Sequence, residues 1–287
     1  MTKIGVVIPV YNGEKTIEKS IESLFFQTYK DWLAVIINDG STDRTRDILD
    51  KYSMDSRFHV FHWKENKGRP HARQKGLELV RELGLKYMCM LDADDWYYPN
   101  KLKSQFEILE KNKDLTLVSS AVGVTNIDGD FFKILRPFPN FKSFYCSDFR
   151  EFIKLPHASS IIRVAHIGKY LKYDEDLKLA QDQDFLRRLL INRHYAFDPC
   201  VQYIYNREES FSVVKYRRSM FYDFLSYKNL QFGIRANTFY LLQSTFKFLA
   251  VWLLSIFNLQ RIYLARLGVN PASNEILEYK VNNKYYN

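Results

Sequence analysis

Four short apolar runs, each followed by a helical pattern, constrain the fold of this chain more than any other feature. The runs are Ile4–Pro9, Trp32–Ile37, Phe58–Trp63 and Tyr87–Leu91. Amphipathic helical patterns follow them at residues 16–26, 41–52, 70–83 and 99–111. Short apolar strands separated by helices of this length predict βαβ units and a parallel sheet. Right-handed crossovers then bring the carboxyl ends of these strands to one edge of the sheet.

Polar residues gather at this expected edge. The loops after the four strands, at residues 10–14, 38–43, 65–73 and 92–95, are rich in Asn, Asp, Gly and Arg. Asn-Gly and Asp-Gly-Ser sequences are ordinary turn formers, so each loop taken alone is consistent with a structural turn. Four such loops in succession indicate a ligand site, because open α/β sheets bind ligands beyond the carboxyl ends of their strands.

The loop after the fourth strand, Asp92-Ala93-Asp94-Asp95, is the most acidic of the four. Carboxylates packed this closely repel one another, and a shared divalent cation relieves the repulsion. The pattern indicates a metal site. The alternative is an exposed acidic turn before the helix that begins near Pro99.

The pattern changes between Leu117 and about Arg207. Short β-like runs appear there without long crossovers between them, at residues 117–125, 131–135, 159–163 and 201–205. They predict an antiparallel or mixed extension of the sheet. A helical pattern at residues 182–190 lies within this part, and an N-cap is the simplest role for Asp182 at its start.

From about Tyr216 the chain is aromatic, basic and helical in pattern. Its most apolar segment, residues 239–257, is long enough to span a bilayer but is interrupted by polar residues around Lys247. We expect this segment to lie in a membrane interface, with Trp252 at headgroup level. Packing on the catalytic domain or on a second subunit, and a spanning helix, are the alternatives. The tail after Asn270 is polar and Tyr-rich, and we expect it to be loosely ordered.

The net charge limits the kinds of partner that this chain is suited to bind, and the cysteine content indicates its cellular compartment. The net charge of +9 is compatible with nucleic acid, anionic lipid or a phosphorylated substrate, but the positive charges do not form one run. The three cysteines, Cys89, Cys146 and Cys200, form an odd set without metal-ligand spacing, which favours a reducing compartment. The N-terminal apolar run is too short for a signal peptide. We therefore expect a cytoplasmic protein that is peripheral on the inner face of the plasma membrane.

Two enzyme classes with parallel sheets fit the loop after the first strand poorly. A nucleotidyltransferase normally has a Gly-rich loop bearing Arg or Lys there, and a dinucleotide-dependent dehydrogenase has Gly-x-Gly-x-x-Gly. The sequence Tyr11-Asn12-Gly13-Glu14 is neither.

In their order and spacing, these motifs resemble family 2 glycosyltransferases of the GT-A fold, as found in bacterial surface-polysaccharide assembly. The resemblance rests on Val7–Asn12, Asn38–Asp43, Asn66–Gly68 with Ala72–Gly76, and Leu91–Trp96. It is strong over about the first 115 residues and continues more weakly through Ala180-Gln181-Asp182 and residues 205–212. It implies an α/β GT-A catalytic domain at residues 1–215, with a nucleotide-binding half at 1–115 and an acceptor-binding half at 116–215. A helical extension at 216–270 and a polar tail at 271–287 would follow.

The resemblance also implies an activity. Such an enzyme transfers a sugar, with inversion, from a nucleotide-diphosphate sugar, usually a UDP-sugar, to a hydroxyl of a saccharide or polyprenyl-linked acceptor. Its partners would be the donor, the acceptor and a membrane surface, and not nucleic acid. A non-catalytic nucleotide-sugar or glycolipid binding protein on the same fold is the alternative.

Carried over residue by residue, the resemblance places a donor nucleotide in contact with eight residues. These are Pro9, Val10, Tyr11, Glu14, Asp39, Arg73, Asp92 and Ala93. Asp39 would accept the imide N–H of uracil, Tyr11 would border the base, and Glu14 would approach the ribose. Arg73, with Lys67 nearby, would approach the diphosphate. Asp94 would be the direct ligand of Mg²⁺ or Mn²⁺, and Asp92 would lie near the metal or the ribose.

The base for an inverting displacement must lie opposite the leaving group. In the family it is the Asp of a Glu-Asp pair at a helix start, and here the pair is Gln181-Asp182. Asp182 is therefore the predicted base, with Asp184 as the alternative. Trp96 is interpreted either as a sugar-stacking residue or as core. His157 is interpreted either as a contact to the acceptor or diphosphate or as a structural histidine.

Overall fold

The computed structural model describes residues 4–126, 128–148, 151–206 and 268–284, with a few isolated positions between 218 and 253. The helical extension expected at residues 216–270, including the apolar segment 239–257, therefore lies almost entirely outside the described residues. Within the described part of the chain, no helix is long and apolar enough to cross a membrane.

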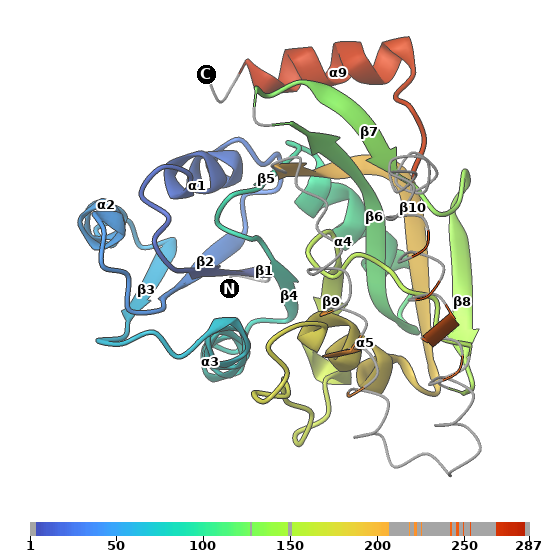
Figure 1. Cartoon of the computed structure of the whole chain (residues 1–287), viewed down its shortest axis with the longest axis horizontal. Helices are drawn as coiled ribbons and strands as arrows, with labels where there is room; N and C mark the ends of the chain where they lie inside the picture. Colours follow the sequence, from blue (N-terminus) through green and yellow to red (C-terminus); the bar gives the residue numbers. More distant parts are fainter. Residues whose placement is uncertain are drawn as a thin grey trace.

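Ten strands of the described residues form one sheet (Figure 1). Its main path has the strand order β3-β2-β1-β4-β9-β6-β10-β5, while β7 pairs with β6 and β8 pairs with β10. The first-half strands are β1 Ile4–Val10, β2 Trp32–Asn38, β3 Phe58–His62, β4 Tyr87–Met90 and β5 Trp96–Tyr97. The second-half strands are β6 Leu115–Thr125, β7 Phe131–Leu135, β8 Lys142–Cys146, β9 Ile161–Arg163 and β10 Arg193–Asn206.

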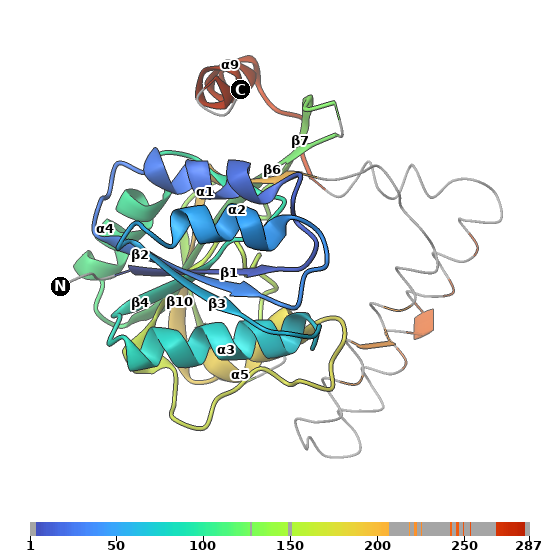
Figure 2. The ribbon, with the colours of Figure 1, turned by 90° about the vertical axis from the view of Figure 1, so that its left-hand side faces the viewer.

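Helices cover both faces of this sheet. They are α1 Ile17–Phe25, α2 Thr45–Tyr52, α3 Arg69–Glu82, α4 Lys101–Lys111, α5 Gln181–Leu190 and α9 Ser273–Asn283. Figure 2 shows α1 and α2 on one side of the strands and α3 on the other. β1 pairs in parallel with β2 and β4, and β2 pairs in parallel with β3. The predicted α/β architecture of the GT-A type, with a mainly parallel central sheet, is confirmed.

The two faces of β1 belong to two separate cores. Val6 and Ile8 pack with apolar residues of α1, α2 and α4, whereas Val7 packs with those of α3 and α5. Because successive side chains of a strand point to opposite faces, a strand buried on both sides is a continuous apolar run. Each fully buried Val, Leu or Ile contributes roughly 1.5–3 kcal/mol to folding, so these layers fix the strand ends that carry the polar loops.

Two glycines allow α3 to lie directly on β1. A Cβ atom at Gly76 would stand 2.2 Å from Cγ1 of Val7. A Cβ atom at Gly5 would stand 2.8 Å from Cδ1 of Leu85 and 3.0 Å from Cγ2 of Val80. A larger residue at either position would push the helix and the strand apart.

The second half differs from the prediction in two strands. β10 begins at Arg193, well before the predicted start at Val201, and it runs parallel to β6. Its pairing is irregular between Asp198 and Val201, next to Pro199, and this interruption hides the first half of the strand in the sequence. β8 was not predicted, because most of its side chains are exposed and its residues do not alternate cleanly.

The prediction of a loosely ordered tail after Asn270 was wrong for residues 273–283, which form α9. Tyr279 anchors this helix: its ring is buried and stacks on Phe131, with centroids 4.9 Å apart. The Tyr279 hydroxyl also donates to the Gly129 carbonyl at 2.6 Å. These contacts join segments some 150 residues apart, so no local pattern reveals them.

Candidate active site

The loops after β1 and β2 interlock at the carboxyl edge of the sheet. The Asn12 N–H donates to Ser41 Oγ at 2.9 Å, and Asn12 Oδ1 accepts the Thr42 N–H at 2.8 Å. Asn12 has a φ of 52°, in the left-handed region that Asn tolerates better than most residues. Tyr11, beside it, is 50% exposed and can cover a ligand without repacking the core.

The predicted neighbours of the nucleotide differ in how they are held. Val10 is buried at the end of β1, while Pro9 and Ala93 are half-buried. Glu14 accepts the Arg44 N–H at 3.1 Å and so faces the start of α2.

Asp39 holds the loop that leads into α3. Its buried carboxylate accepts the N–H of Lys67 at 2.7 Å and the N–H of Gly68 at 2.9 Å. The next residue, Gly40, has a φ of 66°, and a Cβ there would stand 2.3 Å from the Glu65 carbonyl carbon. The edge therefore brings the loops after β2 and β3 into direct contact, and Asp39 lies between them.

Arg73 and Asp92 form the central ion pair. Arg73 Nη2 lies 3.2 Å from Asp92 Oδ1, and the side chains are 5% and 21% exposed. Burial alone would raise the pKa of the Asp92 carboxyl, but the guanidiniums of Arg73 and Arg69 outweigh burial and lower that pKa. Arg69 and Arg73 are four residues apart and so share one face of α3. Arg69 is exposed and was not assigned a role from the sequence, although this spacing could have indicated one.

The three carboxylates after β4 divide into two kinds. Asp94 keeps an exposed surface, but the protein atoms packed around its carboxyl partly desolvate that group, and this desolvation together with the Asp92 carboxylate raises its pKa. Asp95 is buried and structural: it accepts the Tyr203 hydroxyl at 2.5 Å and the Asn206 N–H at 2.9 Å, which ties this loop to β10. Burial and the two neighbouring carboxylates raise the pKa of Asp95 well above its usual range.

Asp92 and Asp94 together fit a divalent cation that arrives with a diphosphate. No group of three or more His, Cys, Asp or Glu side chains with metal-binding geometry occurs within the described residues. Mg²⁺ is typically held by one or two carboxylates while substrate phosphates and water supply the other ligands. Burial is the main cause of the raised pKa of Asp94, and repulsion by the Asp92 carboxylate, which such a cation would relieve, adds to it.

Asp182, from the second half of the chain, lies near the Arg73–Asp92 ion pair, and the three side chains form one charged cluster. Asp182 lies in the first turn of α5, close enough to Arg73 and His157 for its carboxylate to favour the charged form of both side chains. For His157 this effect is smaller than the opposing effects of burial and Arg73, so the pKa of His157 is still lowered. Ala180, just before the helix, has a φ of 60°. This conformation costs roughly 1–2 kcal/mol for a residue with a Cβ, and it directs the chain into the helix.

His157 is a neutral, buried neighbour of the cluster. Burial and the Arg73 guanidinium lower the pKa of His157 to about 4. Its Nε2 lies 3.0 Å from the Tyr173 hydroxyl, while its Nδ1 has no hydrogen-bond partner among the described residues. Tyr173 stacks on Phe185 of α5, with centroids 4.2 Å apart, and its N–H donates to Gln74 Oε1 at 3.0 Å. Tyr173 thus connects α3, α5 and His157, a role that the sequence did not indicate.

The structure bears on two alternatives from the sequence. Asp184 is buried and ion-paired with Arg188, one turn along the same helix, which favours Asp182 over Asp184 as the predicted base. Trp96 is buried and has Lys19 Nζ 3.8 Å from its ring centroid. Of the two interpretations of Trp96, the core residue is therefore the one that fits.

Comparisons with known proteins point to one family. The family model described as glycosyl transferase family 2 matches residues 5–170. An uncharacterized glycosyltransferase of Methanocaldococcus jannaschii is 33% identical over 224 residues, which are 74% of this chain and 74% of that protein. The putative teichuronic acid biosynthesis glycosyltransferase TuaG of Bacillus subtilis is 40% identical over 107 residues, which are 37% of this chain and 41% of that protein.

A solved structure supports the fold. The crystal structure of S. aureus TarS 1-349 in complex with UDP-GlcNAc has a TM-score of 0.58 and 21% sequence identity, and it covers 86% of this chain and 71% of that chain. At this identity the similarity shows a shared fold.

Proposed function

Because the chain belongs to glycosyl transferase family 2, we propose that it transfers a sugar, with inversion, from a UDP-sugar to a hydroxyl of a saccharide or lipid-linked acceptor. One observation carries this proposal. The fold brings Asp92, Arg73 and Asp182 into one electrostatic cluster at the carboxyl edge of the sheet, although they lie on three separate elements. Transfer requires a cationic group near the donor diphosphate and a carboxylate base near the acceptor hydroxyl, and the two must lie close together.

The nucleotide part of the donor would lie along the loops after β1 and β2. Tyr11 is exposed at this edge, and Asp39 is held rigidly beside it by two backbone N–H groups. The uracil assignment is supported by the complex of the similarly folded TarS with UDP-GlcNAc. Arg69 and Arg73 would face the diphosphate from α3, since guanidinium groups suit phosphate oxygens.

Asp94 and Asp92 would hold Mg²⁺ or Mn²⁺. Such a cation, when bound, stabilises the negative charge that develops on the leaving diphosphate.

Asp182 would act as the base. The acceptor oxygen attacks the anomeric carbon, the bond from that carbon to the diphosphate oxygen breaks, and UDP leaves with that electron pair. The proton of the acceptor hydroxyl passes to the Asp182 carboxylate. A positioned base of this kind contributes roughly 10²–10⁴-fold to the rate. Tyr173, which stacks on Phe185 of α5 and lies 3.0 Å from His157 Nε2, would help to position the helix that carries Asp182.

The transferred group would be a hexosyl or N-acetylhexosaminyl unit, and the pathway would be polysaccharide or lipopolysaccharide biosynthesis. The similarity to TuaG, whose name refers to teichuronic acid, supports this class of product. The basic, aromatic sequence at 216–270 supports an acceptor held at a membrane, at the inner face of the plasma membrane.

Calorimetry of UDP and UDP-GlcNAc binding, with and without Mn²⁺, tests the donor site. We expect metal-dependent binding by the wild type, its loss in Asp94→Ala, and no change in Asp114→Asn, which removes an exposed carboxylate outside the cluster. An absence of UDP binding under both conditions would reject the uracil assignment.

A transfer assay on Asp182→Asn tests the base and separates an enzyme from a non-catalytic binding protein. This variant should bind UDP as the wild type does but transfer sugar about 10²–10⁴-fold more slowly. Full transfer by Asp182→Asn would reject Asp182 as the base. Wild-type protein that binds the donor but never releases UDP, with any acceptor offered, would favour the non-catalytic alternative.

A further inference from the structure

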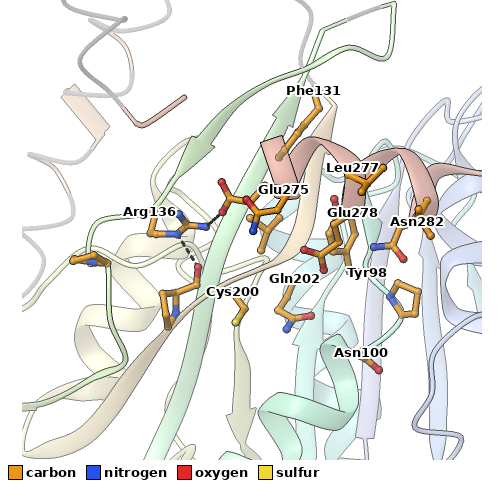
Figure 3. Close-up of a pocket in the computed structure, with 16 residues that line it drawn as sticks. Tyr98, Asn100, Phe131, Arg136, Cys200, Gln202, Glu275, Leu277, Glu278 and Asn282 are labelled. Carbon is orange, nitrogen blue, oxygen red and sulfur yellow. Dashed lines mark hydrogen bonds and ion pairs between the residues drawn. The ribbon is translucent and has the colours of Figure 1, made fainter. Parts of the chain in front are cut away.

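A second cleft lies beneath α9, away from the proposed donor site (Figure 3). Its volume is about 810 Å³, and its walls come from the β5–α4 connection, β7, β10 and α9. None of the residues proposed to contact the donor, the metal or the acceptor hydroxyl lines this cleft.

The cleft is held open by contacts at both ends of α9. Near the start of the helix, Glu275 forms an ion pair with Arg136, whose Nε donates to the Pro199 carbonyl at 2.8 Å. Near its end, Asn283 Oδ1 accepts a hydrogen bond from Lys19 Nζ at 3.3 Å. The stack of Tyr279 on Phe131 fixes the middle. The helix is therefore docked on the sheet without closing the space below it.

The most informative residue of the cleft is Gln202. It is only 7% exposed, yet its side-chain amide makes no hydrogen bond to any described residue. Its neighbour Tyr203 points to the opposite side of β10, toward Asp95, so Gln202 faces the cleft. The Gln202 amide is not shut off from the cleft, so its N–H and C=O groups are open to hydrogen bonding with a ligand there.

The other lining groups share the chemistry of Gln202. Asn282 lines the cleft, and its side-chain amide likewise makes no hydrogen bond to a described residue. Figure 3 shows Glu278 between α9 and Gln202, on the side of the helix that faces the cleft. Asn100 and Asn274 add two more amides, and the rings of Tyr98 and Phe131 add flat apolar surface.

This lining fits an uncharged ligand that is rich in hydroxyl groups. Amides and carboxylates pair with hydroxyls, which both donate and accept hydrogen bonds, and ring faces contact C–H groups. An anionic ligand fits poorly, because Glu278 has no cationic partner and Arg136 is already paired with Glu275. The described residues also contain no set of three metal-binding side chains. The volume lies within the usual range of ligand sites, roughly 300–1,000 Å³.

We propose that the cleft beneath α9 binds an uncharged saccharide, at a site separate from the donor site. That this saccharide is part of the acceptor or product glycan rests on the proposed function. The proposal that a saccharide site exists does not rest on the proposed function, because it is argued from the residues that line the cleft.

The test uses the full chain and a panel of neutral mono- to tetrasaccharides built from glucose, galactose and N-acetylglucosamine. Binding is measured by NMR with saturating UDP and Mn²⁺ present. We expect at least one saccharide to shift the signals of residues 98–100, 199–202 and 274–282. Binding by none of the panel at millimolar concentration would overturn the proposal. So would binding that UDP displaces, because that saccharide would occupy the donor site.

Three variants locate the site. Gln202→Ala and Asn282→Ala should each weaken binding about tenfold, the equivalent of losing one hydrogen bond to the ligand. Asn282 lies on an exposed helix, so its replacement keeps the test valid if the strand variant folds poorly. Lys280→Ala, on the same helix but outside the cleft, is the matched control and should bind normally. Unchanged affinity in both cleft variants would overturn the proposal.

Saccharide binding and sugar transfer are separate measurements, so the two proposals fail separately. Intact binding in the cleft without transfer would reject the proposed function alone. Intact transfer without binding in the cleft would reject the second site alone.

Discussion

His157 should make the protein less stable in mild acid. Burial and the Arg73 guanidinium lower its pKa to about 4, against 6.5 for an exposed histidine. Between these two pKa values the unfolded state binds a proton that the folded state does not bind. The free energy of unfolding therefore falls as the pH drops from 6.5 to about 4, and this contribution then becomes constant.

The size of the effect follows from the two pKa values. A difference of one pKa unit corresponds to about 1.36 kcal/mol, so the full difference approaches about 3 kcal/mol below the folded pKa. At about pH 5 the same linkage gives a loss of ~2 kcal/mol relative to neutral pH. This is a large share of the stability of a typical domain, roughly 5–15 kcal/mol.

Urea unfolding of wild type and His157→Gln, measured from neutral pH to about pH 5, isolates this contribution. Other groups titrate in both proteins and cancel in the difference, so wild type should lose ~2 kcal/mol more than the variant over this range. His194→Gln, at an exposed site on β10, is the matched control and should follow the wild type. Parallel pH profiles for wild type and His157→Gln would refute the assignment of His157 as a buried neutral histidine.

Three further substitutions test the packing that supports the site. In urea unfolding, Gly76→Ala should lower the free energy of unfolding by about 1–3 kcal/mol, because the steric contact with Val7 outweighs the better helix propensity of Ala. A stabilised variant would contradict the close approach of α3 to β1. Tyr203→Phe should cost about 1–3 kcal/mol in the same assay, since it leaves the buried Asp95 carboxyl without its hydroxyl partner, and wild-type stability would contradict that role. Tyr279→Ala should free α9 and speed its removal by limited proteolysis, whereas an unchanged cleavage rate would mean that the stack does not hold the helix.

The first half of the fold was predictable because β1, β2 and β4 are buried on both faces. Such strands appear as continuous apolar runs, and the helices between them fix parallel pairing and the edge where the loops meet. That Asp92 and Arg73 would share a site also followed, since the resemblance placed both at the donor. The sequence could not show that Asp95 differs from its neighbours, because its partner Tyr203 lies more than 100 residues away.

The second half was less predictable because its key contacts are non-local. Tyr173 lies between β9 and α5 outside any regular helix or strand, and its place is set by packing on Phe185 and by Gln74 of α3. α9 has a weak apolar pattern and depends on Phe131 for its anchor. The cleft beneath α9 involves four separate segments, so no spacing in the sequence indicates it.

The two glycines at the contact between α3 and β1 have a consequence for strand register. A strand that is apolar on both faces is not held in register by polarity, because a slip of one residue exchanges one apolar side chain for another. Gly5 and Gly76 supply shape instead: a slip would press Ile4 or Val6 into the space that Gly5 leaves for Leu85. One residue of slip would move the loop after β1 by about 3.3 Å past its neighbours. The alignment of the loops at the carboxyl edge of the sheet thus depends on two positions that carry no side chain.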